Sequence, residues 1–245
     1  MSALIQSVHR QELDEQGYTV LENLFSPSDM AKIAGLIEAH RQRHIDQLNA
    51  LGGTDGGISR ASEITFTDHL AEADSEIMAF VKRPEFVDIT TSLLGPDTDL
   101  YWNQSVYKLG HGTKPFPWHQ DDGYMNVDPS PYLTIWIALN DVTIENGCVW
   151  FLPGSHKQGV VPHEDTSIGK SCYSLDAENQ GVPAPLPAGS AAVFWSTTMH
   201  KSGINVSNGE RKGLVIQYCH AGLRYSHNQE LVPDLTPVAR MGSVA

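Results

Sequence analysis

The second half of the chain is a series of short strand-like segments separated by turns. These segments are rich in β-branched and aromatic residues, and turns such as PGSH and SNGE lie between them. They read LYWNQSVYKL, YLTIWIAL, CVWFL, SAAVFWS and KGLVIQYC. Many short strands that follow leading helices are typical of a double-sheet jelly roll. We therefore expect a mainly β, cupin-like fold with the N-terminal helices packed on the outside of one sheet.

Helical patterns fill the first part of the chain. Ser26 is a suitable N-cap, Pro27 suits the first helical position, and Asp29 completes a capping box. Apolar residues then recur with the period of a helix. These patterns predict helices at Ser7–Gln16, at about 27–50 and at about 71–94, with a fresh helix starting at Pro84, and a strand at Tyr18–Leu24.

The length and patterning predict one domain. A chain of 245 residues is within the range that one barrel or sandwich can use. Neither a Pro/Ser-rich linker nor an internal repeat separates the helical part from the β-rich part. We expect a single domain over 1–245, with a helical part at about 1–97 and a β core at about 98–222.

Charge and cysteine content restrict the partners and the compartment. The chain has 16 Lys and Arg against 29 Asp and Glu, and its formal net charge is -13. Nucleic acids and anionic membrane surfaces are therefore poor partners. The cysteines, Cys148, Cys172 and Cys219, form no CxxC pair, and no leader or long apolar span is evident. These features predict a cytoplasmic protein, and they carry no signal about oligomeric state.

Two histidines stand out among the 11 in the chain. In His119-Gln120-Asp121, a histidine and a carboxylate two positions apart on an extended strand would face the same side and could bind one cation. His200 follows another strand and could complete a triad of two histidines and one carboxylate, which leaves positions open on Fe(II). The other histidines in polar or helical segments have surface interpretations: His9, His40, His44, His69, His163 and His227.

A basic residue follows His200 at a short distance. Arg211 opens the strand-like segment KGLVIQYC, and a guanidinium inside a barrel is costly unless it meets an anion such as a carboxylate. Ser202 could share that carboxylate. This set is consistent with an iron site that also holds 2-oxoglutarate. A zinc-dependent hydrolase or isomerase is one alternative, but it leaves Arg211 and Ser202 without a function. A non-catalytic binding module is the other, and the intact triad with its anion site argues against it.

Three longer segments resemble the phytanoyl-CoA dioxygenase family of Fe(II)- and 2-oxoglutarate-dependent oxygenases. They are WHQDDGY, LTIWIALNDVTIENGCVWFLPGSHKQG and HKSGINVSNGERKGL, and the opening GYTVLENLFSPSDM is similar as well. The resemblance implies a double-stranded β-helix and a reaction that uses Fe(II), 2-oxoglutarate and O2. It also implies that His119, Asp121 and His200 ligate iron, and that Arg211 and Ser202 hold the distal carboxylate of 2-oxoglutarate.

Further positions follow from the resemblance or from the expected topology. Lys108 and Trp136 match positions that flank 2-oxoglutarate, although Trp136 could also be core packing. Asp122 should project away from Asp121, as an outer-sphere or surface group. Gln104 and Tyr124 are candidate substrate contacts. The segments expected to border the pocket are Ser59–Thr67, His111–Pro131, Val160–Pro187 and Gly222–Leu231.

The implied activity is hydroxylation of a C–H bond, with release of succinate and CO2. Halogenating relatives replace the metal carboxylate with a small residue, so the presence of Asp121 argues against halogenation. Desaturation, epoxidation and ring formation stay open, because they depend on the substrate. The acidic composition and the lack of a Lys/Arg cluster make a CoA thioester less attractive. We expect a small polar metabolite or a natural-product intermediate as substrate.

Overall fold

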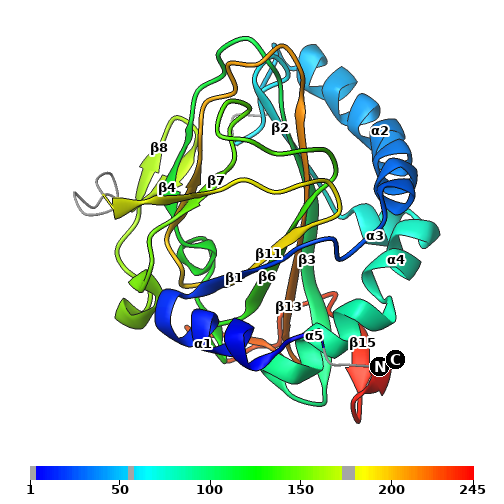
Figure 1. Cartoon of the computed structure of the whole chain (residues 1–245), viewed down its shortest axis with the longest axis vertical. Helices are drawn as coiled ribbons and strands as arrows, with labels where there is room; N and C mark the ends of the chain where they lie inside the picture. The colour runs from blue at the N-terminus through cyan, green and yellow to red at the C-terminus, as the bar shows by residue number, and fades with distance from the viewer. Residues whose placement is uncertain (1–3, 55–57, 173–179) are drawn as a thin grey trace.

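Two antiparallel sheets face each other in the computed structural model, which describes residues 4–54, 58–172 and 180–245 (Figure 1). The expected double-sheet fold with outer helices is confirmed. The major sheet has the order β1-β11-β6-β13-β3-β15-β16, and β2 also pairs with β3. Its strands are β1 (Tyr18–Leu21), β2 (Ile64–Asp68), β3 (Thr98–Lys108), β6 (Leu133–Ala138), β11 (Ala191–Trp195), β13 (Arg211–His220), β15 (Thr236–Arg240) and β16 (Ser243–Val244).

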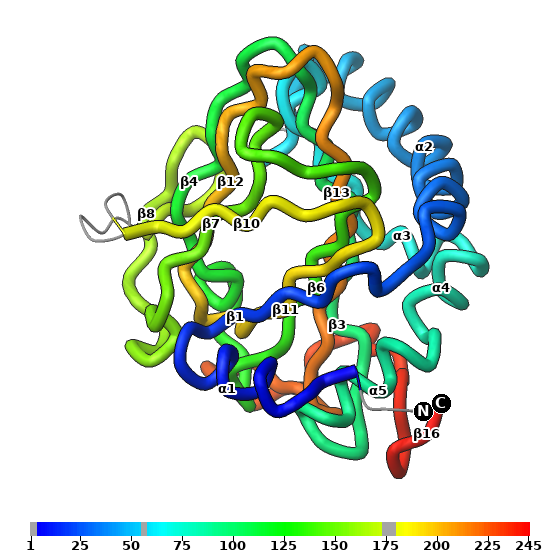
Figure 2. Tube along the Cα trace, in the orientation of Figure 1, coloured from blue at the N-terminus to red at the C-terminus, as the bar shows by residue number. Residues whose placement is uncertain are grey.

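The minor sheet lies opposite and has the order β10-β7-β12-β4. Its strands are β4 (Phe116–His119), β7 (Val149–Phe151), β10 (Val182–Ala184) and β12 (His200–Ser202). Two short ribbons complete the β structure: β5 (Val127–Asp128) with β14 (Arg224–Tyr225), and β8 (Glu164–Thr166) with β9 (Gly169–Ser171). Figure 2 shows β1 beside β11, although the two strands are far apart in sequence.

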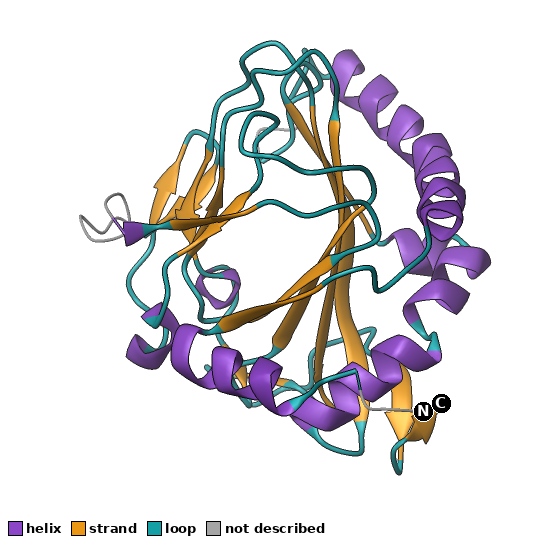
Figure 3. Cartoon of the chain, viewed as in Figure 1, coloured by secondary structure: helices purple, strands orange, loops and turns teal. Residues whose placement is uncertain are grey.

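The helices pack on the outer face of the major sheet and along one end of the molecule (Figure 3). They are α1 (Ser7–Gln16), α2 (Pro27–Ala50), α3 (Leu70–Ala73), α4 (Ser75–Val81) and α5 (Pro84–Leu94). The predicted bounds of α1 and α2 are confirmed, and the capping box of Ser26 and Asp29 is present. The region expected as two helices from Ala71 is three, because Asp74 is extended and caps the backbone N–H groups of Glu76 and Ile77.

Two further expectations about the N-terminal half need correction. The strand expected at Tyr18–Leu24 ends at Leu21, because the chain turns at Asn23, whose φ is 52°. The segment Ser59–Thr67, expected as a loop, contains most of strand β2, which pairs along β3. The major sheet also takes in β15 and β16, which lie beyond the β-rich region expected to end near residue 222.

Strand alternation divides the core into two layers. In β6, Leu133, Ile135 and Ile137 face the helices, whereas Trp136 and Ala138 face the space between the sheets. The helical side of the sheet is sealed by apolar residues of α2, α4 and α5. Polar side chains that point between the sheets therefore lie in an apolar enclosure, which is where the candidate site forms.

The described helices and cysteines add two observations. No helix in the described ranges is long and apolar enough to cross a membrane. Cys148, Cys172 and Cys219 are buried free thiols, and burial raises the pKa of each, so they stay protonated and unreactive near neutral pH.

Candidate metal centre and its cavities

Two histidines meet where the minor sheet ends. His119 closes β4 and His200 opens β12, and the antiparallel register of these strands places the two residues opposite each other. The Nδ1 atom of His119 lies 2.9 Å from the carbonyl oxygen of Pro117. The Nδ1 atom of His200 lies 3.0 Å from that of Thr198. Because a carbonyl only accepts, each Nδ1 carries the proton and each Nε2 presents a lone pair.

Asp121 supplies an oxygen to the same point. Its Oδ1 atom lies 3.7 Å from His119 Nε2 and 3.5 Å from His200 Nε2. The three potential ligand atoms lie within 4.8 Å of one another. Thr134 donates its hydroxyl to Asp121 Oδ2 over 2.6 Å, which orients the carboxylate and leaves Oδ1 free. Two imidazoles and one carboxylate on one face match the donor set that suits Fe(II) with open positions.

The protonation state of His119 also suits a metal ligand. Burial and the neighbouring His200 hold the pKa of His119 well below its ordinary value, so the imidazole is neutral at physiological pH. A neutral imidazole binds a cation without first releasing a proton.

The local backbone differs from the expected extended strand. β4 ends at His119, and Asp121 begins a 3-10 turn over Asp121–Gly123. His119 and Asp121 therefore converge on one point because the strand changes into a turn between them. Gln120, between them, is fully buried, and its side-chain amide donates to the carbonyl oxygens of Gly159 and Thr197 at 2.8 and 2.6 Å. These bonds fix the junction.

His163 has a supporting position that its polar sequence context did not indicate. Its Nε2 accepts the backbone N–H of Gln120 at 3.0 Å, and its Nδ1 donates to the carbonyl oxygen of Val161 at 2.8 Å. The surface interpretation of His163 is therefore wrong, because the side chain is half-buried behind the metal-binding turn. A Cβ on Gly123 would lie 2.3 Å from the His163 ring, so this turn packs directly on the histidine.

Asp122 is an inward-facing group rather than a surface one. It is 1% exposed, and it accepts hydrogen bonds from the hydroxyls of Ser130 and Ser196. Burial raises the pKa of its carboxyl. The 3-10 turn, rather than an extended strand, aims Asp122 into the protein behind Asp121.

Arg211 lies at the far end of a small inner cavity that also contains the three candidate ligands. This cavity of about 60 Å³ is lined by Asp121, Thr134, Trp136, Ser202 and Arg211 among others. Arg211 is fully buried, and its Nε and Nη2 atoms have no hydrogen-bond partner among the described residues. Its guanidinium lies 5.2 Å from the centre of the Trp136 ring. A buried guanidinium with unpaired donors fits a carboxylate ligand.

Lys108 and Ser202 lie beside Arg211. Lys108 is opposite Arg211 in the register of β3 and β13. Its Nζ atom donates to Ser202 Oγ at 3.0 Å and to the carbonyl oxygen of Gly203 at 2.5 Å. Burial, and secondarily the charge of Arg211, lower the pKa of Lys108 to about 6. The structure thus brings Lys108, Trp136, Ser202 and Arg211 together in one polar group.

A larger outer cavity of about 510 Å³ opens from the metal-binding residues and shares His119, Asp121 and Gln104 with the inner one. Both candidate substrate contacts, Gln104 and Tyr124, line it. The Tyr124 hydroxyl also accepts the backbone N–H of Lys170 at 3.0 Å. Burial raises the pKa of Tyr124 to about 12, so the phenol stays protonated.

Several lining residues were missed at the sequence level. Strand pairing shifts between Gln217 and Tyr218, which leaves Tyr101 bulged from β3. Tyr101 and Trp102 therefore both line the outer cavity, although neighbours on a regular strand face opposite sides. Their aromatic character was visible in the sequence, whereas the bulge depends on tertiary register. Glu72 and Gln217 line the cavity too and carried no sequence signal.

The segments expected to border the pocket contribute unequally. Phe66, five residues between Phe116 and Met125, and Tyr225 line the outer cavity, as do Ile58 and Val232 to Asp234 just outside the expected ranges. No described residue of Val160–Pro187 lines it, although Lys170 binds Tyr124 from behind. Residues 173–179 of that segment lie outside the described part of the chain.

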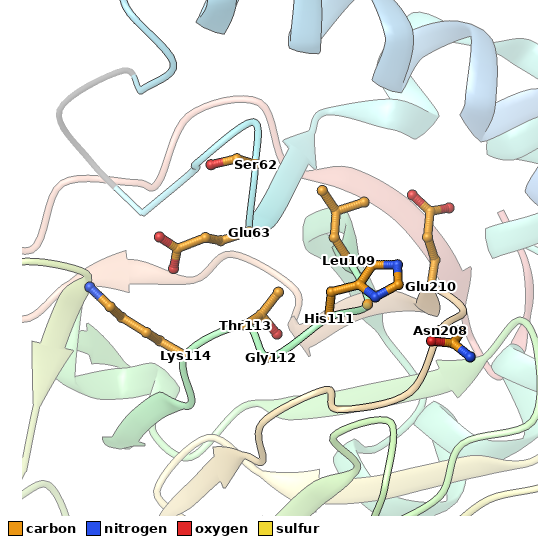
Figure 4. Close-up of a pocket in the computed structure, with 10 residues that line it drawn as sticks. Ser62, Glu63, Leu109, His111, Gly112, Thr113, Lys114, Asn208 and Glu210 are labelled. Atoms are coloured by element: carbon orange, nitrogen blue, oxygen red, sulfur yellow. The ribbon is translucent and has the colours of Figure 1, made fainter.

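A second hollow of similar size lies apart from this chemistry. It measures about 530 Å³ and is lined by Glu63, His111, Lys114, Asn208 and Glu210 among others (Figure 4). It shares no lining residue with the inner and outer cavities at the candidate metal ligands. Its side chains mix both charges at the surface, so its size alone does not indicate a site.

Comparisons with known proteins agree with this geometry. A family profile described as Phytanoyl-CoA dioxygenase (PhyH) matches residues 13–213. A probable alpha-ketoglutarate-dependent hypophosphite dioxygenase of Stutzerimonas stutzeri is 28% identical over 228 residues, which cover 86% of this chain and 78% of that protein. The peroxisomal phytanoyl-CoA dioxygenase of Homo sapiens is 26% identical over 233 residues, covering 88% and 69% of the two chains.

A solved structure shares the fold. The non-heme alpha ketoglutarate dependent carbocyclase SnoK from nogalamycin biosynthesis superposes with a TM-score of 0.76 at 22% identity, covering 96% of this chain and 97% of that one. The family match spans most of the chain. His119, Asp121 and His200 form a cluster of three ligands that would leave coordination positions on iron open. The chain therefore belongs to the phytanoyl-CoA dioxygenase family and is an Fe(II)- and 2-oxoglutarate-dependent dioxygenase.

Proposed function

We propose that this enzyme hydroxylates a C–H bond of a small polar metabolite or a natural-product intermediate, with release of succinate and CO2. The observation that carries the proposal is the inner cavity, which is lined both by the metal-binding cluster and by Arg211 with its unpaired guanidinium. Bound iron and 2-oxoglutarate would supply the oxidising power there. The protein would position the reactants and exclude water.

The iron ligands in this proposal are His119 Nε2, Asp121 Oδ1 and His200 Nε2. Each is fixed by a hydrogen bond on its opposite atom, so the cluster is held in shape before a metal arrives. Asp121 supplies a carboxylate at the position that halogenating relatives leave vacant. We therefore expect oxygen transfer rather than halide transfer.

The co-substrate would lie between the iron ligands and Arg211. The two free donors of Arg211 suit the distal carboxylate of 2-oxoglutarate, and the hydroxyl of Ser202 can donate to the same group because it already accepts from Lys108. Trp136 packs on the guanidinium and keeps it in place. Lys108 adds positive charge whenever its amine is protonated.

The outer cavity would hold the substrate next to the iron. Its volume of about 510 Å³ is within the range of small-molecule sites. Gln104 lines both cavities and is placed to contact the reacting end of the substrate, with Tyr124 on the side wall.

Anaerobic titration with Fe(II) and then 2-oxoglutarate tests this proposal. A keto acid chelated to ferrous iron gives a weak visible charge-transfer band, and we expect that band to appear. The Arg211→Gln variant should weaken 2-oxoglutarate binding by about 10- to 100-fold, because a charge-assisted pair in a buried site is lost. Iron binding should be unchanged.

Lys212→Gln is the matched control, because Lys212 neighbours Arg211 but forms surface ion pairs with Glu38 and Glu210. It should titrate like the unmodified enzyme. Iron binding without the charge-transfer band, or an unchanged band in Arg211→Gln, would overturn the assignment of the co-substrate site.

A further inference from the structure

The outer cavity combines an aromatic wall with an acidic charge. Its aromatic lining residues are Phe66, Tyr101, Trp102, Phe116, Tyr124, Tyr132 and Tyr225. Glu72 and Asp234 also line it, and none of the described residues that line it is Lys or Arg. His69 is the basic side chain nearest to Glu72, with its Nδ1 atom 4.0 Å from the carboxylate. His69 also lines the cavity, and its ring centre lies 4.6 Å from that of Trp102. The cavity therefore presents carboxylates and π-faces, with His69 as the basic side chain beside them.

The reactive centre does not account for this acidity. Ferrous iron, the Asp121 carboxylate and the doubly negative co-substrate sum to about one negative charge, which Arg211 offsets. The charge of the outer cavity is then set by Glu72 and Asp234. An anionic substrate would be repelled by both carboxylates, and a neutral substrate would gain no attraction from their charge.

Glu72 is held in place toward the cavity. The side-chain amide of Asn103 donates to both of its carboxylate oxygens, at 3.1 and 2.8 Å, and Asn103 Oδ1 accepts the backbone N–H of Ala71 at 2.8 Å. Asn103 is 1% exposed. A buried amide thus holds the short helix α3 on β3, which gives the Glu72 carboxylate a defined position in the cavity wall.

The same wall contains a polar side chain that lines the cavity. Gln217 is 7% exposed, and it lies among the residues that line the cavity. It is opposite Trp102 and Thr134 in the strand register. Its amide is therefore placed to contact a polar atom of a ligand within the cavity.

We propose that the substrate is a small molecule with an ammonium group, which binds near the Glu72 carboxylate among the aromatic side chains of the outer cavity. Its apolar portion lies along the remaining aromatic residues and reaches the iron past Gln104 and Gln217. A cation over an aromatic face gains from both the ring quadrupole and the carboxylate. This inference rests on the proposed function and specifies its substrate class.

Three probes that share a phenylethyl group test the charge preference. Phenethylamine, phenethyl alcohol and hydrocinnamate are cationic, neutral and anionic versions of a phenylethyl group. Each is titrated by calorimetry into anaerobic enzyme loaded with Fe(II) and 2-oxoglutarate. We expect the amine to bind about tenfold more tightly than the alcohol, and hydrocinnamate to bind most weakly.

Variants test which residues cause the preference for the amine over the alcohol. Glu72→Gln keeps an oxygen for Asn103 and removes the charge, so it should reduce the preference for the amine over the alcohol to about twofold or less. Glu76→Gln is the matched control, because Glu76 pairs with Lys32 at the surface. It should keep the full preference. Trp102→Leu should weaken the amine more than the alcohol.

The charge-transfer band separates this inference from the proposed function. Loss of the band in the unmodified enzyme would count against the proposed function. If the band is present, equal binding of amine and alcohol, tighter binding of hydrocinnamate, an unchanged preference in Glu72→Gln, or no binding of any probe at about 10 mM would overturn the ammonium site alone.

Discussion

The hydroxyl of Thr134 has a role at the metal centre although it offers no direct ligand. It donates to Asp121 Oδ2 over 2.6 Å, and this bond aims Oδ1 at the two histidines. Thr134→Val preserves the shape of the side chain and removes the donor. We expect about 10-fold weaker Fe(II) binding, because groups that orient a ligand typically contribute this much to affinity. Anaerobic Fe(II) titration measures the change.

Thr90→Val is the control for Thr134→Val. Thr90 is also fully buried, but its hydroxyl bonds the carbonyl oxygen of Val87 within α5, away from the centre. Its iron affinity should equal that of the unmodified enzyme. Equal affinity in Thr134→Val would mean that the carboxylate is oriented by the backbone turn alone.

The buried amine of Lys108 makes stability depend on pH. Its pKa is lowered to about 6, first by burial and then by Arg211, whereas an unfolded chain restores the ordinary value near 10.4. Between these values the unfolded chain binds more protons, so this group makes folding more favourable as pH rises. The destabilising effect is largest below about pH 6 and disappears above about pH 10.4.

Lys108→Met should remove that dependence. The unfolding free energy of the unmodified protein minus that of the variant should rise by up to about 1.4 kcal/mol for each pH unit from 7 to 9. Urea denaturation of the metal-free proteins at these two pH values measures it. A difference that stays constant with pH would show that Lys108 is charged in the folded protein.

At the scale of single elements, Gly213 in β13 permits Trp136 to lie beside Arg211. A Cβ at Gly213 would be 2.2 Å from the Trp136 ring, so Gly213→Ala must displace the indole. We expect a loss of about 1–3 kcal/mol of unfolding free energy from overpacking, together with weaker 2-oxoglutarate binding as the ring shifts against the guanidinium. Urea denaturation and the charge-transfer band report the two effects.

Gly35 in α2 is the opposite case and serves as the comparison. It is exposed, and a Cβ at this position would meet no other atom within 4 Å. Gly35→Ala should stabilise the protein by about 0.5–1 kcal/mol, because alanine favours the helix. If both alanine variants behaved alike, the contact between Gly213 and Trp136 would have no energetic consequence.

Elements were predictable from sequence where local signals determine them. The capping residues and apolar period predicted the bounds of α2, and a run of β-branched and aromatic residues predicted β6. Asp74 was missed as a helix break, because its cap interrupts an otherwise continuous helical pattern. Strand β2 was missed because its pairing with β3, rather than its own short sequence, makes it a strand. The bulge at Tyr101 arises from register with β13, which no local pattern contains.

At the scale of the whole molecule, the site depends on both sheets. The histidines expected from sequence lie on the minor sheet, and Arg211 lies on β13 of the major sheet. The chemistry and spacing of the motifs suggested this set, and the family resemblance specified the role of each residue. No local rule determines which distant strands meet. The packing of the core between the sheets determines which strands meet.

Iron and 2-oxoglutarate should therefore stabilise the enzyme cooperatively. The co-substrate would connect iron on the minor sheet to Arg211 on the major sheet, so its binding should require the metal. With iron bound and 2-oxoglutarate at 100 times its Kd, the expected gain is about 2.7 kcal/mol, or roughly 5–10 °C in Tm for a chain of this size. Anaerobic calorimetric melting measures this gain, and a chelator should abolish it.

The Arg211→Gln variant tests whether 2-oxoglutarate connects the two sheets or binds at the metal alone. This variant should keep the rise in Tm that iron produces and lose most of the further rise from 2-oxoglutarate. An equal rise from 2-oxoglutarate without iron would place the co-substrate away from the metal. An undiminished rise in Arg211→Gln would mean that the major sheet takes no part in holding it, and the enclosed space between the sheets would then need another occupant.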